Sequence, residues 1–398
     1  MISPVTMKNI VLLIKREFRI FWTNKVFAFT FLCMPLLLGV VLGNVYIRGK
    51  VKQQFIIIVD KDNTPLSDRL SDMLSDNPTL KVIAIKYESI GIHQSMLKDR
   101  AVAIVTIPDR FEAEVLTRRQ PEINIYLNMS NTLTGGAVSS AISATATTLN
   151  AGIAISSLQR KGSPAALAKE NYEAMKMNVF QQFNPSGNYL IYLWTGFIFA
   201  IMHQLLLLAL GSSFSLEYAS NQFNEGGLLR YCLSPLVLIF VKMIPYLLMS
   251  VWTICCYYLL ADQFHIPLPI HPSALLISVF LMVIATSSLA ILYSVRNPLP
   301  LKATQLLMSL ASPAFSLSGF SWPSSQMPEI LQWFADIIPL TPFLRAMRMV
   351  TVQGANFTDI LPHLNHQLIQ IAVYLSLSIL VLRKQIGIAL KQSIIVAK

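Results

Sequence analysis

Long apolar runs without charged residues recur along the chain, separated by polar stretches. The first, Val26–Ile47, has 22 residues. At 1.5 Å per residue, a helix of that length crosses a hydrocarbon core of about 30 Å. Five later runs are also long and apolar: Tyr189–Phe214, Pro235–Ala261, Ser273–Val295, Ala303–Phe320 and Gln367–Leu382. Pro35 predicts a kink in the first span, and Pro313 predicts an interruption of the fifth. The pattern predicts an α-helical membrane protein with six transmembrane helices.

A polar region, 48–188, separates the first two spans. It holds 16 Lys/Arg and 13 Asp/Glu. Four β-branched or apolar runs predict strands: Phe55–Asp60, Leu80–Lys86, Ala101–Ile107 and Glu122–Leu127. Five stretches predict helices: Pro65–Ser75, Ser89–Asp99, Asp109–Arg119, Thr132–Leu158 and Ala165–Phe180. The β-α-β-α-β-α-β order that begins this region indicates a small α/β domain, inserted between transmembrane helices 1 and 2. Thr132–Leu158 is long enough to return the chain to the membrane.

Composition supports a membrane location. The chain of 398 residues is 54% hydrophobic and only 13% charged, whereas soluble domains carry roughly 25% charged residues. The net charge of +11 raises the possibility of nucleic-acid binding. However, the Lys/Arg residues form no patch interleaved with aromatics and no known binding motif. Much of the excess flanks the apolar runs, where membrane topology explains it.

The positive charges also predict the orientation. Five Lys/Arg lie in the first 25 residues, two in the turn 296–302, and four in Arg383 and the tail 384–398, while Asp262–Pro272 has none. Basic segments stay on the cytoplasmic side, so we expect both termini in the cytoplasm. The α/β domain and a segment at 318–348, within the membrane region 189–383, then lie outside.

The N-terminal segment, 1–25, predicts an amphipathic helix in the cytoplasmic interface. Its apolar and basic faces are made by separate residues: Val11, Ile14, Phe18 and Trp22 on one, Lys15, Arg16 and Arg19 on the other. A basic flank that only orients the first span is the alternative. No small-residue cleavage site follows that span, so we expect an uncleaved anchor.

The segment Ser318–Arg348 is divided by prolines into pieces too short to cross a bilayer. The dividing residues are Pro323, Pro328, Pro339 and Pro342. Apolar residues between them fall on helical spacing: Ile330, Leu331, Phe334, Ile337 and Ile338. Irregular backbone at membrane depth survives only inside protein or beside a water-filled cavity. The segment therefore predicts either a re-entrant element at the mouth of a translocation path or an ordinary proline-rich loop outside the membrane.

This segment resembles the signature of type-2 ATP-binding-cassette (ABC) exporter permeases, in the efflux-type group with a large extracytoplasmic insert. The matching motifs are Ser318-Gly319-Phe320, Trp322-Pro323, Met327-Pro328, Ile338-Pro339-Leu340-Thr341-Pro342 and Arg345. The resemblance implies an exit gate at Gly319, Phe320, Pro323, Pro328, Pro339, Thr341, Pro342 and Arg345. The stretches Asp60–Leu70 and Ile107–Phe111 are similar to the extracytoplasmic insert of that family.

The resemblance also implies contacts with a separate ATPase. The segment Lys15-Arg16-Glu17-Phe18 is similar to the family's elbow helix. The loop Ser215–Ser234 is similar to its coupling loop, here with Glu217, Glu225, Gly226, Gly227 and Arg230. The family commonly has Thr where this chain has Gly227, which puts the contact residues in doubt. A plain turn is the alternative.

Candidate chemistry within the chain itself is sparse. The nearest approach to a phosphate-binding loop, Gly43 to Val51, has five intervening residues instead of four and lacks the final hydroxyl. The aspartates at 60, 62, 68, 72 and 76 lack the Gly and Glu of a calcium loop. None of the four cysteines lies in 48–188, which argues against zinc or redox chemistry there. We therefore expect no catalytic residue, metal or bound cofactor in this chain, with ATP and magnesium in a partner.

Two ionisable residues lie within the predicted spans. An intramembrane ionisable residue is a functional candidate, but for His203 a neutral ring hydrogen-bonded to a neighbouring helix is the favoured interpretation. Lys242 is close enough to the end of its span to extend to the interface.

Together with these features, the resemblance implies the membrane subunit of an ABC exporter in a bacterial inner membrane, which moves an amphiphilic substrate out of the cytoplasm. The expected partners are a separate nucleotide-binding ATPase, a second permease copy or paralogue, and the lipid bilayer. An ion-coupled secondary transporter is one alternative, although the predicted spans contain no Asp or Glu and no repeated halves. A non-transporting, membrane-anchored binding protein is the other.

Overall fold

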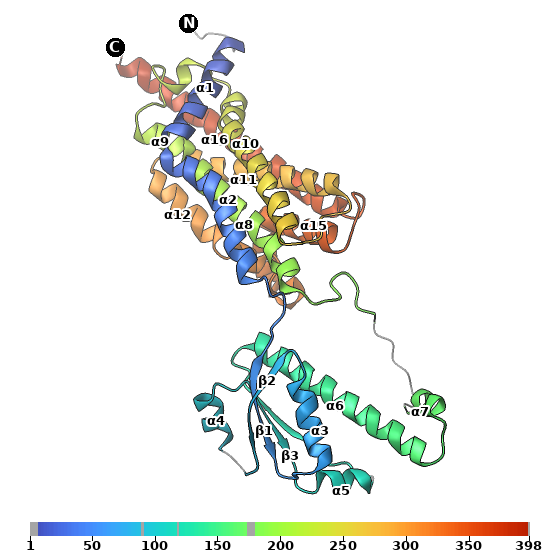
Figure 1. Cartoon of the computed structure of the whole chain (residues 1–398). Coiled ribbons are helices and arrows are strands. Elements are labelled where there is room, and N and C mark those ends of the chain that lie inside the picture. The colour runs from blue at the N-terminus through green and yellow to red at the C-terminus, as the bar shows by residue number, and fades with distance from the viewer. Residues whose placement is uncertain (1–6, 89–90, 118, 173–179, 397–398) are drawn as a thin grey trace. The chain divides into compact units, whose positions relative to one another are not determined.

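The computed structural model describes residues 7–88, 91–117, 119–172 and 180–396. Two compact units make up the chain (Figure 1). The helical unit comprises Met1–Gly49 and Gln181–Lys398, and the sheet unit comprises Lys50–Phe180.

The helical unit contains long helices joined by short ones. The long helices are α1 (Met7–Thr23), α2 (Lys25–Val45), α8 (Thr195–Gly211), α10 (Pro235–Gln263), α11 (Pro272–Arg296), α12 (Pro300–Ala311), α15 (Leu340–Val352) and α16 (Leu361–Val396). The shorter elements are a π-helical turn (Leu190–Trp194), α9 (Ser213–Ala219), α13 (Ala314–Leu317), α14 (Glu329–Ile337) and 3-10 turns at Leu228–Arg230 and Ser324–Gln326. Large apolar side chains remain exposed along α2 and α16 (Val26, Phe29, Leu37, Val41, Ile369, Leu380), as expected where lipid is the solvent.

Among the described residues, six helices are long and apolar enough to cross a membrane. Five of them correspond to predicted spans one, two, three, four and six: Lys25–Val45, Leu190–Ala219, Pro235–Gln263, Pro272–Arg296 and Leu361–Gln392. The sixth is α6 (Thr132–Arg160) of the sheet unit. The number of candidates thus equals the predicted number of spans. However, α6 is among them and the predicted span Ala303–Phe320 is not.

The fifth predicted span, Ala303–Phe320, is not one helix. It consists of α12, which ends at Ala311, and the four-residue α13, which follows Pro313. Proline has no N–H for the helix ladder and its ring crowds the preceding turn, so the interruption predicted at Pro313 is confirmed. Helix α16 (Leu361–Val396) extends beyond the sixth predicted span at both ends and includes most of the predicted tail, 384–398.

The sheet unit has a four-stranded sheet in the order β2-β1-β3-β4. Its strands are β1 (Gln54–Asp60), β2 (Leu80–Lys86), β3 (Ala103–Ile107) and β4 (Asn124–Leu127). Strand β1 pairs parallel with β2 and β3, and β4 closes one edge antiparallel to β3. The predicted strands and the alternating order are confirmed, with α3 (Pro65–Ser75) following β1, α4 (Ile92–Lys98) following β2, and α5 (Phe111–Leu116) following β3.

Helices cover both faces of this sheet (Figure 1). Alternate side chains of β1 explain why, since Ile56 and Ile58 pack with α3, α5 and α6, while Ile57 and Val59 pack toward α4. Helix α6 contributes Val138, Ile142 and Leu149 to the first core. Its hydropathy thus reflects packing on the sheet along its N-terminal half. Helix α7 (Ala165–Asn171) is shorter than the predicted 165–180, of which 173–179 lie outside the described residues, as do Ser89 and Ile90 of another predicted helix.

Candidate functional site

Four charged side chains meet where α1, α9 and α10 pack together. Arg16 of α1 forms a bidentate pair with Glu217 of α9, with both N–O distances at 2.7 Å. Lys242 of α10 donates to Glu217 at 2.9 Å and to the two carboxylate oxygens of Glu17 at 3.2 and 3.3 Å. Arg16 also donates to Glu17 at 2.8 Å. We call these four residues the charge cluster.

The charge cluster is buried and electrically balanced. The side chain of Lys242 is 3% exposed, Glu217 5%, Glu17 8% and Arg16 21%. Burial on its own lowers the pKa of Arg16, but hydrogen bonds and charge attraction from Glu217 and Glu17 outweigh it, and the net effect raises the pKa. Two cations and two carboxylates compensate one another where an isolated charge would be strongly unfavourable. The arrangement joins three helices from distant parts of the sequence.

The buried face of α1 differs from the predicted apolar face. Leu13, Glu17 and Phe21 recur every four residues and are buried, whereas Val11 and Trp22 are 45% and 50% exposed. Phe21 contacts the rings of Phe31 and Tyr246 edge-on or tilted, at centroid distances of 5.9 and 5.5 Å. The face of α1 that packs on the protein thus holds Glu17, which lies inward against Lys242. Contact of the exposed apolar residues with the membrane interface stays a prediction.

Helix α9 is fixed at its first turn by α11. The Ser294 hydroxyl of α11 accepts hydrogen bonds from the backbone N–H groups of Phe214 at 2.8 Å and Ser215 at 3.1 Å. The Ser215 hydroxyl donates to the Asn297 carbonyl at 2.6 Å. These bonds satisfy N–H groups that a helix start leaves without a partner. A displacement of α9 therefore has to involve α11 as well as the charge cluster.

The loop that follows α9 is held by Asn224 and Gly227. The Asn224 side-chain oxygen accepts from the N–H groups of Gly226 at 3.0 Å and Gly227 at 2.8 Å. The N–H of Leu228 donates to the Gln222 carbonyl at 2.7 Å. A Cβ at position 227 would lie 2.1 Å from that carbonyl oxygen. The close approach of two backbone segments leaves no room for a side chain at Gly227.

The predicted coupling residues do not form one surface. Glu225, Gly226 and Arg230 are exposed in the loop, and Gly227 is buried. Glu217 is 4% exposed as a residue and lies in the charge cluster. It is therefore unavailable for direct contact with a partner. A docking role for Glu225 and Arg230 stays a prediction. Of the elbow segment, Lys15 is exposed and Phe18 partly buried, while Arg16 and Glu17 belong to the charge cluster.

Two expectations for intramembrane residues were wrong. Lys242 does not extend to the interface, because its ammonium group is buried between Glu17 and Glu217. His203 is fully buried, but neither ring nitrogen has a hydrogen-bond partner within the described part of the chain. The pairing of Lys242 was not readable from sequence, since 225 residues separate it from Glu17.

Arg348 binds the backbone of the segment that follows α12. The sequence motifs did not single out this residue. Arg348 donates to the Phe320 carbonyl at 2.6 Å, and its guanidinium carbon lies 4.4 Å from the Phe320 ring centroid. The Tyr192 hydroxyl donates to the same carbonyl, and its ring stacks on Phe320. Gly319 has φ +82, a conformation that favours glycine. The predicted gate residues Gly319 and Phe320 are thus fixed to α15 and to the turn before α8.

The prolines of the segment start helices. Pro323 precedes a 3-10 turn, Pro328 precedes α14, Pro339 precedes α15, and Pro342 lies in the first turn of α15, where no intrahelical N–H is lost. The predicted division into pieces too short to span is confirmed, with nine residues in α14 and 13 in α15. Thr341 is buried and its hydroxyl has no partner among the described residues. Arg345 pairs with Asp336 at 3.0 Å and is partly exposed.

We predict that Arg348→Gln destabilises the helical unit by about 1.5–3 kcal/mol, because a charge-assisted hydrogen bond and a cation–π contact are lost. Arg345→Gln removes only a half-exposed ion pair and should cost less than about 1 kcal/mol. Unfolding of each purified variant by denaturant titration in detergent measures the difference. Equal losses for the two variants would contradict the role assigned to Arg348.

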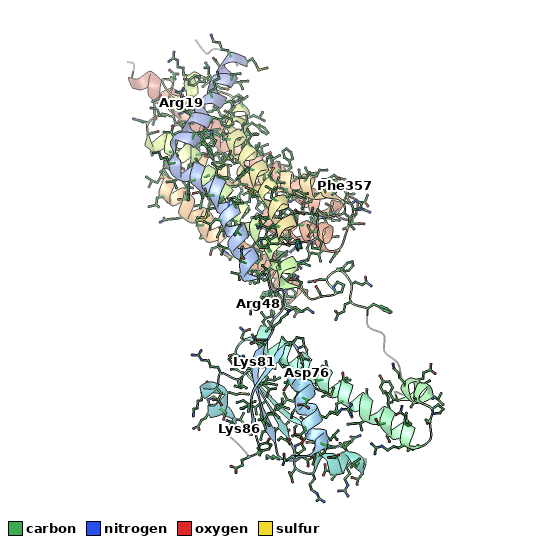
Figure 2. The ribbon with its side chains drawn as sticks, viewed as in Figure 1. Arg19, Arg48, Asp76, Lys81, Lys86 and Phe357 are labelled. Atoms are coloured by element: carbon green, nitrogen blue, oxygen red, sulfur yellow. The ribbon has the colours of Figure 1, made fainter. Side chains whose placement is uncertain are left out.

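The aspartates of the sheet unit lie in two different settings. Asp60 is buried and accepts hydrogen bonds from the N–H groups of Asp62 and Asn63 and from the Ser67 hydroxyl. Asp68 and Asp72 are exposed on α3, and Asp76 is exposed at its end (Figure 2). Asp62 is partly buried as well and accepts from the Glu112 N–H at 2.9 Å. Asp60 therefore holds the turn between β1 and α3, and Asp68, Asp72 and Asp76 form a solvated face.

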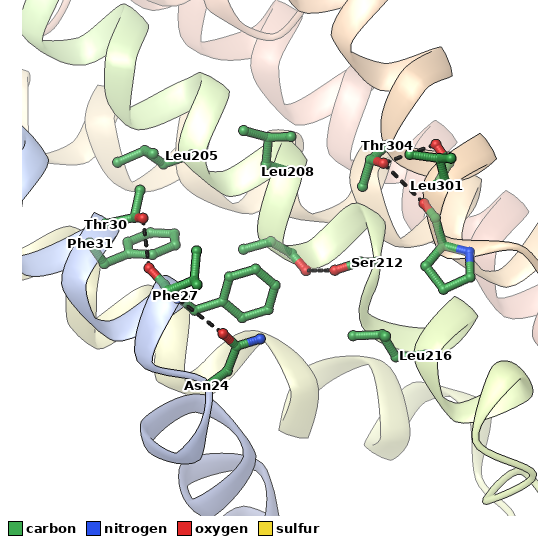
Figure 3. A pocket seen from close by; sticks show the side chains of 13 residues that line it. Asn24, Phe27, Thr30, Phe31, Leu205, Leu208, Ser212, Leu216, Leu301 and Thr304 are labelled. Atoms are coloured by element: carbon green, nitrogen blue, oxygen red, sulfur yellow. Dashed lines mark hydrogen bonds between the residues drawn. The ribbon is translucent and has the colours of Figure 1, made fainter.

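An apolar groove lies between α2, α8 and α12 (Figure 3). Its volume is about 460 Å³, and its walls include Phe31, Leu205, Leu208 and Leu301. It adjoins a smaller hollow of about 350 Å³ over the charge cluster, because Phe27 and Leu216 line both. The groove and the hollow over the charge cluster thus share side chains of α2 and α9.

Several helices that are long and apolar enough to cross a membrane define a multi-pass membrane protein. The chain belongs to the ABC-2 transporter family: the family model described as "ABC-2 family transporter protein" matches residues 25–380. It is similar to the inner membrane transport permease YhhJ of Escherichia coli (strain K12), with 22% identity over 349 residues that cover 85% of this chain and 87% of that protein. The YhhJ protein of Shigella flexneri matches to the same extent. The predicted resemblance is confirmed.

Proposed function

We propose that this chain is the membrane-spanning subunit of an ABC exporter, which moves an amphiphilic substrate of the drug, lipid or glycan class out of the cytoplasm. ATP is hydrolysed by a separate subunit that holds the nucleotide and magnesium. The charge cluster is the observation that carries this proposal. It ties α1 and α10 to α9, whose chain continues directly into the exposed loop with Glu225 and Arg230.

The charge cluster provides a route for force in this mechanism. A partner that pushes on the loop 221–234 displaces α9, and the bidentate Arg16–Glu217 pair transmits that displacement to α1. Lys242 transmits it to α10 through Glu217. Because the buried ions cannot separate without a large desolvation cost, the three helices move together. The transmembrane helices then tilt, and the substrate leaves past Ser318–Arg348.

The arrangement in the membrane follows from this mechanism. The loop that meets the ATPase lies in the cytoplasm with both termini, and the membrane is a bacterial inner membrane, as named for the YhhJ relatives. The sheet unit is then an extracytoplasmic α/β insert between transmembrane helices 1 and 2. Two permease copies, or this chain and a paralogue, enclose the path. The chain itself binds no cofactor and contacts lipid, not nucleic acid.

The structure gives little support to the two alternative functions, an ion-coupled carrier and a membrane-anchored binding protein. An ion-coupled carrier needs a carboxylate that binds and releases its ion, yet Glu17 and Glu217 are both paired with cations. A membrane-anchored binding protein has no need for a buried ionic link that leads to an exposed loop. The exporter proposal uses both features.

The test is affinity purification of the whole chain in mild detergent, with the wild type beside Glu225→Lys/Arg230→Glu. We expect a nucleotide-binding subunit with ATPase activity to copurify with the wild type. Its amount should fall at least about tenfold in the variant, since like charges across an interface cost several kcal/mol.

The control is a variant with two charge reversals in the sheet unit, Asp76→Lys/Lys81→Glu, because both side chains are exposed (Figure 2). It should retain the ATPase. A folded wild type that brings down no ATPase would overturn the proposal, and loss in both variants would remove the loop as the docking site.

A further inference from the structure

The lining of the groove between α2, α8 and α12 is mainly apolar. Its three hydroxyl groups each donate to a nearby backbone carbonyl: Thr30 to Val26 at 2.6 Å, Thr304 to Pro300 at 3.0 Å and Ser212 to Ala209 at 3.0 Å. Asn24 also lines the groove, and its side-chain oxygen accepts from the N–H of Phe27 at 3.3 Å. Figure 3 shows these bonds beside the apolar walls. A ligand inside the groove therefore gains mostly from hydrocarbon contact, because the hydroxyl protons are already bonded.

Two lysines adjoin residues that line the groove. Lys25 is the first residue of α2, between the lining residues Asn24 and Val26, and Lys302 is in the first turn of α12, next to Leu301. Both lysines are exposed, and neither forms an ion pair with any residue that the structure describes. None of the lining residues is acidic.

Two helix starts add to this positive field. Helices α2 and α12 both begin at the rim, and no side chain caps the first N–H groups of α12. The start of a helix favours a negative group through its free N–H groups and its dipole. The lysines and these N–H groups are thus placed for an anion above an apolar slot.

We propose that the groove binds one acyl chain of an anionic phospholipid, whose phosphate lies at the rim beside Lys25 and Lys302. Three features point to this occupant. The volume of about 460 Å³ is within the roughly 300–1,000 Å³ of small-molecule sites, the lining is mainly apolar, and two lysines without an ion pair among the described residues adjoin lining residues. A phospholipid is the amphiphile that a membrane supplies to this position. The groove holds this lipid as a bound component of the protein, independently of whether the protein also transports the lipid.

A ligand in the groove contacts side chains that lie next to the charge cluster. Leu216 lines the groove and is 40% exposed, while the next residue, Glu217, is bound to Arg16 and Lys242. Phe27 lines both the groove and the hollow over the charge cluster. A bound acyl chain therefore contacts α9 next to its ionic contacts.

Native mass spectrometry of the full chain in mild detergent tests the proposal. Phosphatidylglycerol and phosphatidylcholine with identical acyl chains are the probes. We expect retained phosphatidylglycerol to exceed phosphatidylcholine, and Lys25→Gln or Lys302→Gln each to weaken its binding roughly fivefold. Lys384→Gln, an exposed lysine on α16, is the matched control and should bind as the wild type does.

A second pair of variants tests the slot. Leu208→Trp fills the groove and should abolish binding of both lipids, whereas Leu236→Trp, on an exposed part of α10, should not. Size-exclusion elution and thermal unfolding show whether both variants are folded. Equal binding of the two lipids, an equal loss in Lys384→Gln, or unchanged binding in Leu208→Trp would each overturn the proposal. So would a lipid-independent dimer that Leu208→Trp dissociates, because a second copy would then occupy the groove.

Discussion

Lys242→Met should destabilise the helical unit by about 3–5 kcal/mol, the largest stability loss that we expect from a single substitution. Lys242 is 3% exposed and contacts both carboxylates of the charge cluster. Its removal leaves Glu17 and Glu217 to share Arg16, so that one buried negative charge is uncompensated. Breaking a buried ion pair from one side costs on this scale because the remaining charge cannot regain its water.

A compensating variant separates charge balance from packing. In Lys242→Met/Glu17→Gln the Arg16–Glu217 pair, with its two 2.7 Å contacts, remains neutral by itself. We therefore expect the double variant to recover on the order of 1–3 kcal/mol relative to the sum of the single changes. Denaturant titration of the purified chain in detergent measures each free energy of unfolding.

The matched control for this series is Arg345→Met. It breaks the Arg345–Asp336 pair at 3.0 Å, whose side chains are 29% and 40% exposed, and should cost less than about 1 kcal/mol. If Lys242→Met costs no more than Arg345→Met, the charge cluster does not hold α1, α9 and α10 together. Without recovery in the double variant, the loss would come from packing and not from charge.

Gly227→Thr should distort the loop after α9 and reduce the amount of copurified ATPase. A Cβ at this position would lie 2.1 Å from the carbonyl oxygen and 2.8 Å from the carbonyl carbon of Gln222. Backbone atoms cannot move away as a flexible side chain can, so the 2.7 Å bond from Leu228 N–H to Gln222 must lengthen or break. Overpacking and loss of this bond together predict a cost of about 1–3 kcal/mol.

The neighbouring glycine provides the control. A Cβ at Gly226 would meet only the Asn224 side-chain oxygen, at 3.4 Å. We expect Gly226→Ala to retain both stability and the ATPase, and Gly227→Ala to behave like Gly227→Thr. Limited proteolysis of the loop and the copurification assay provide the two readouts. A stable Gly227→Ala with wild-type copurification would show that the loop accepts a side chain and that its backbone contact is dispensable.

Local pattern was sufficient for most of the secondary structure. The four strands and α3 follow from β-branched runs and a proline-led helix start, and the breaks at Pro313, Pro328 and Pro339 follow from proline's missing N–H. The apolar runs likewise predicted five of the six long apolar helices. These features depend on residues that are adjacent in the chain, so they can be predicted from the sequence alone.

Hydropathy was ambiguous where different surroundings favour the same composition. The Ala, Ser and Thr of α6 are as suitable for packing on a sheet as for lipid, and the structure places Val138 and Ile142 of this helix against β1 and β3. Periodicity likewise indicated an apolar face for α1 but not its inward face, because the charged Glu17 is buried there with Leu13 and Phe21.

The sequence by itself determined that this is a helical membrane protein of the ABC-2 family, with an α/β unit and a proline-divided segment. Only the tertiary structure decided that Arg16, Glu17, Glu217 and Lys242 form one cluster. It also decided that Arg348, and not Arg345, binds Phe320. The physical reason is that a buried charge is stabilised by partners that folding brings from distant segments, 201 residues apart for Arg16 and Glu217, and no local pattern specifies such partners.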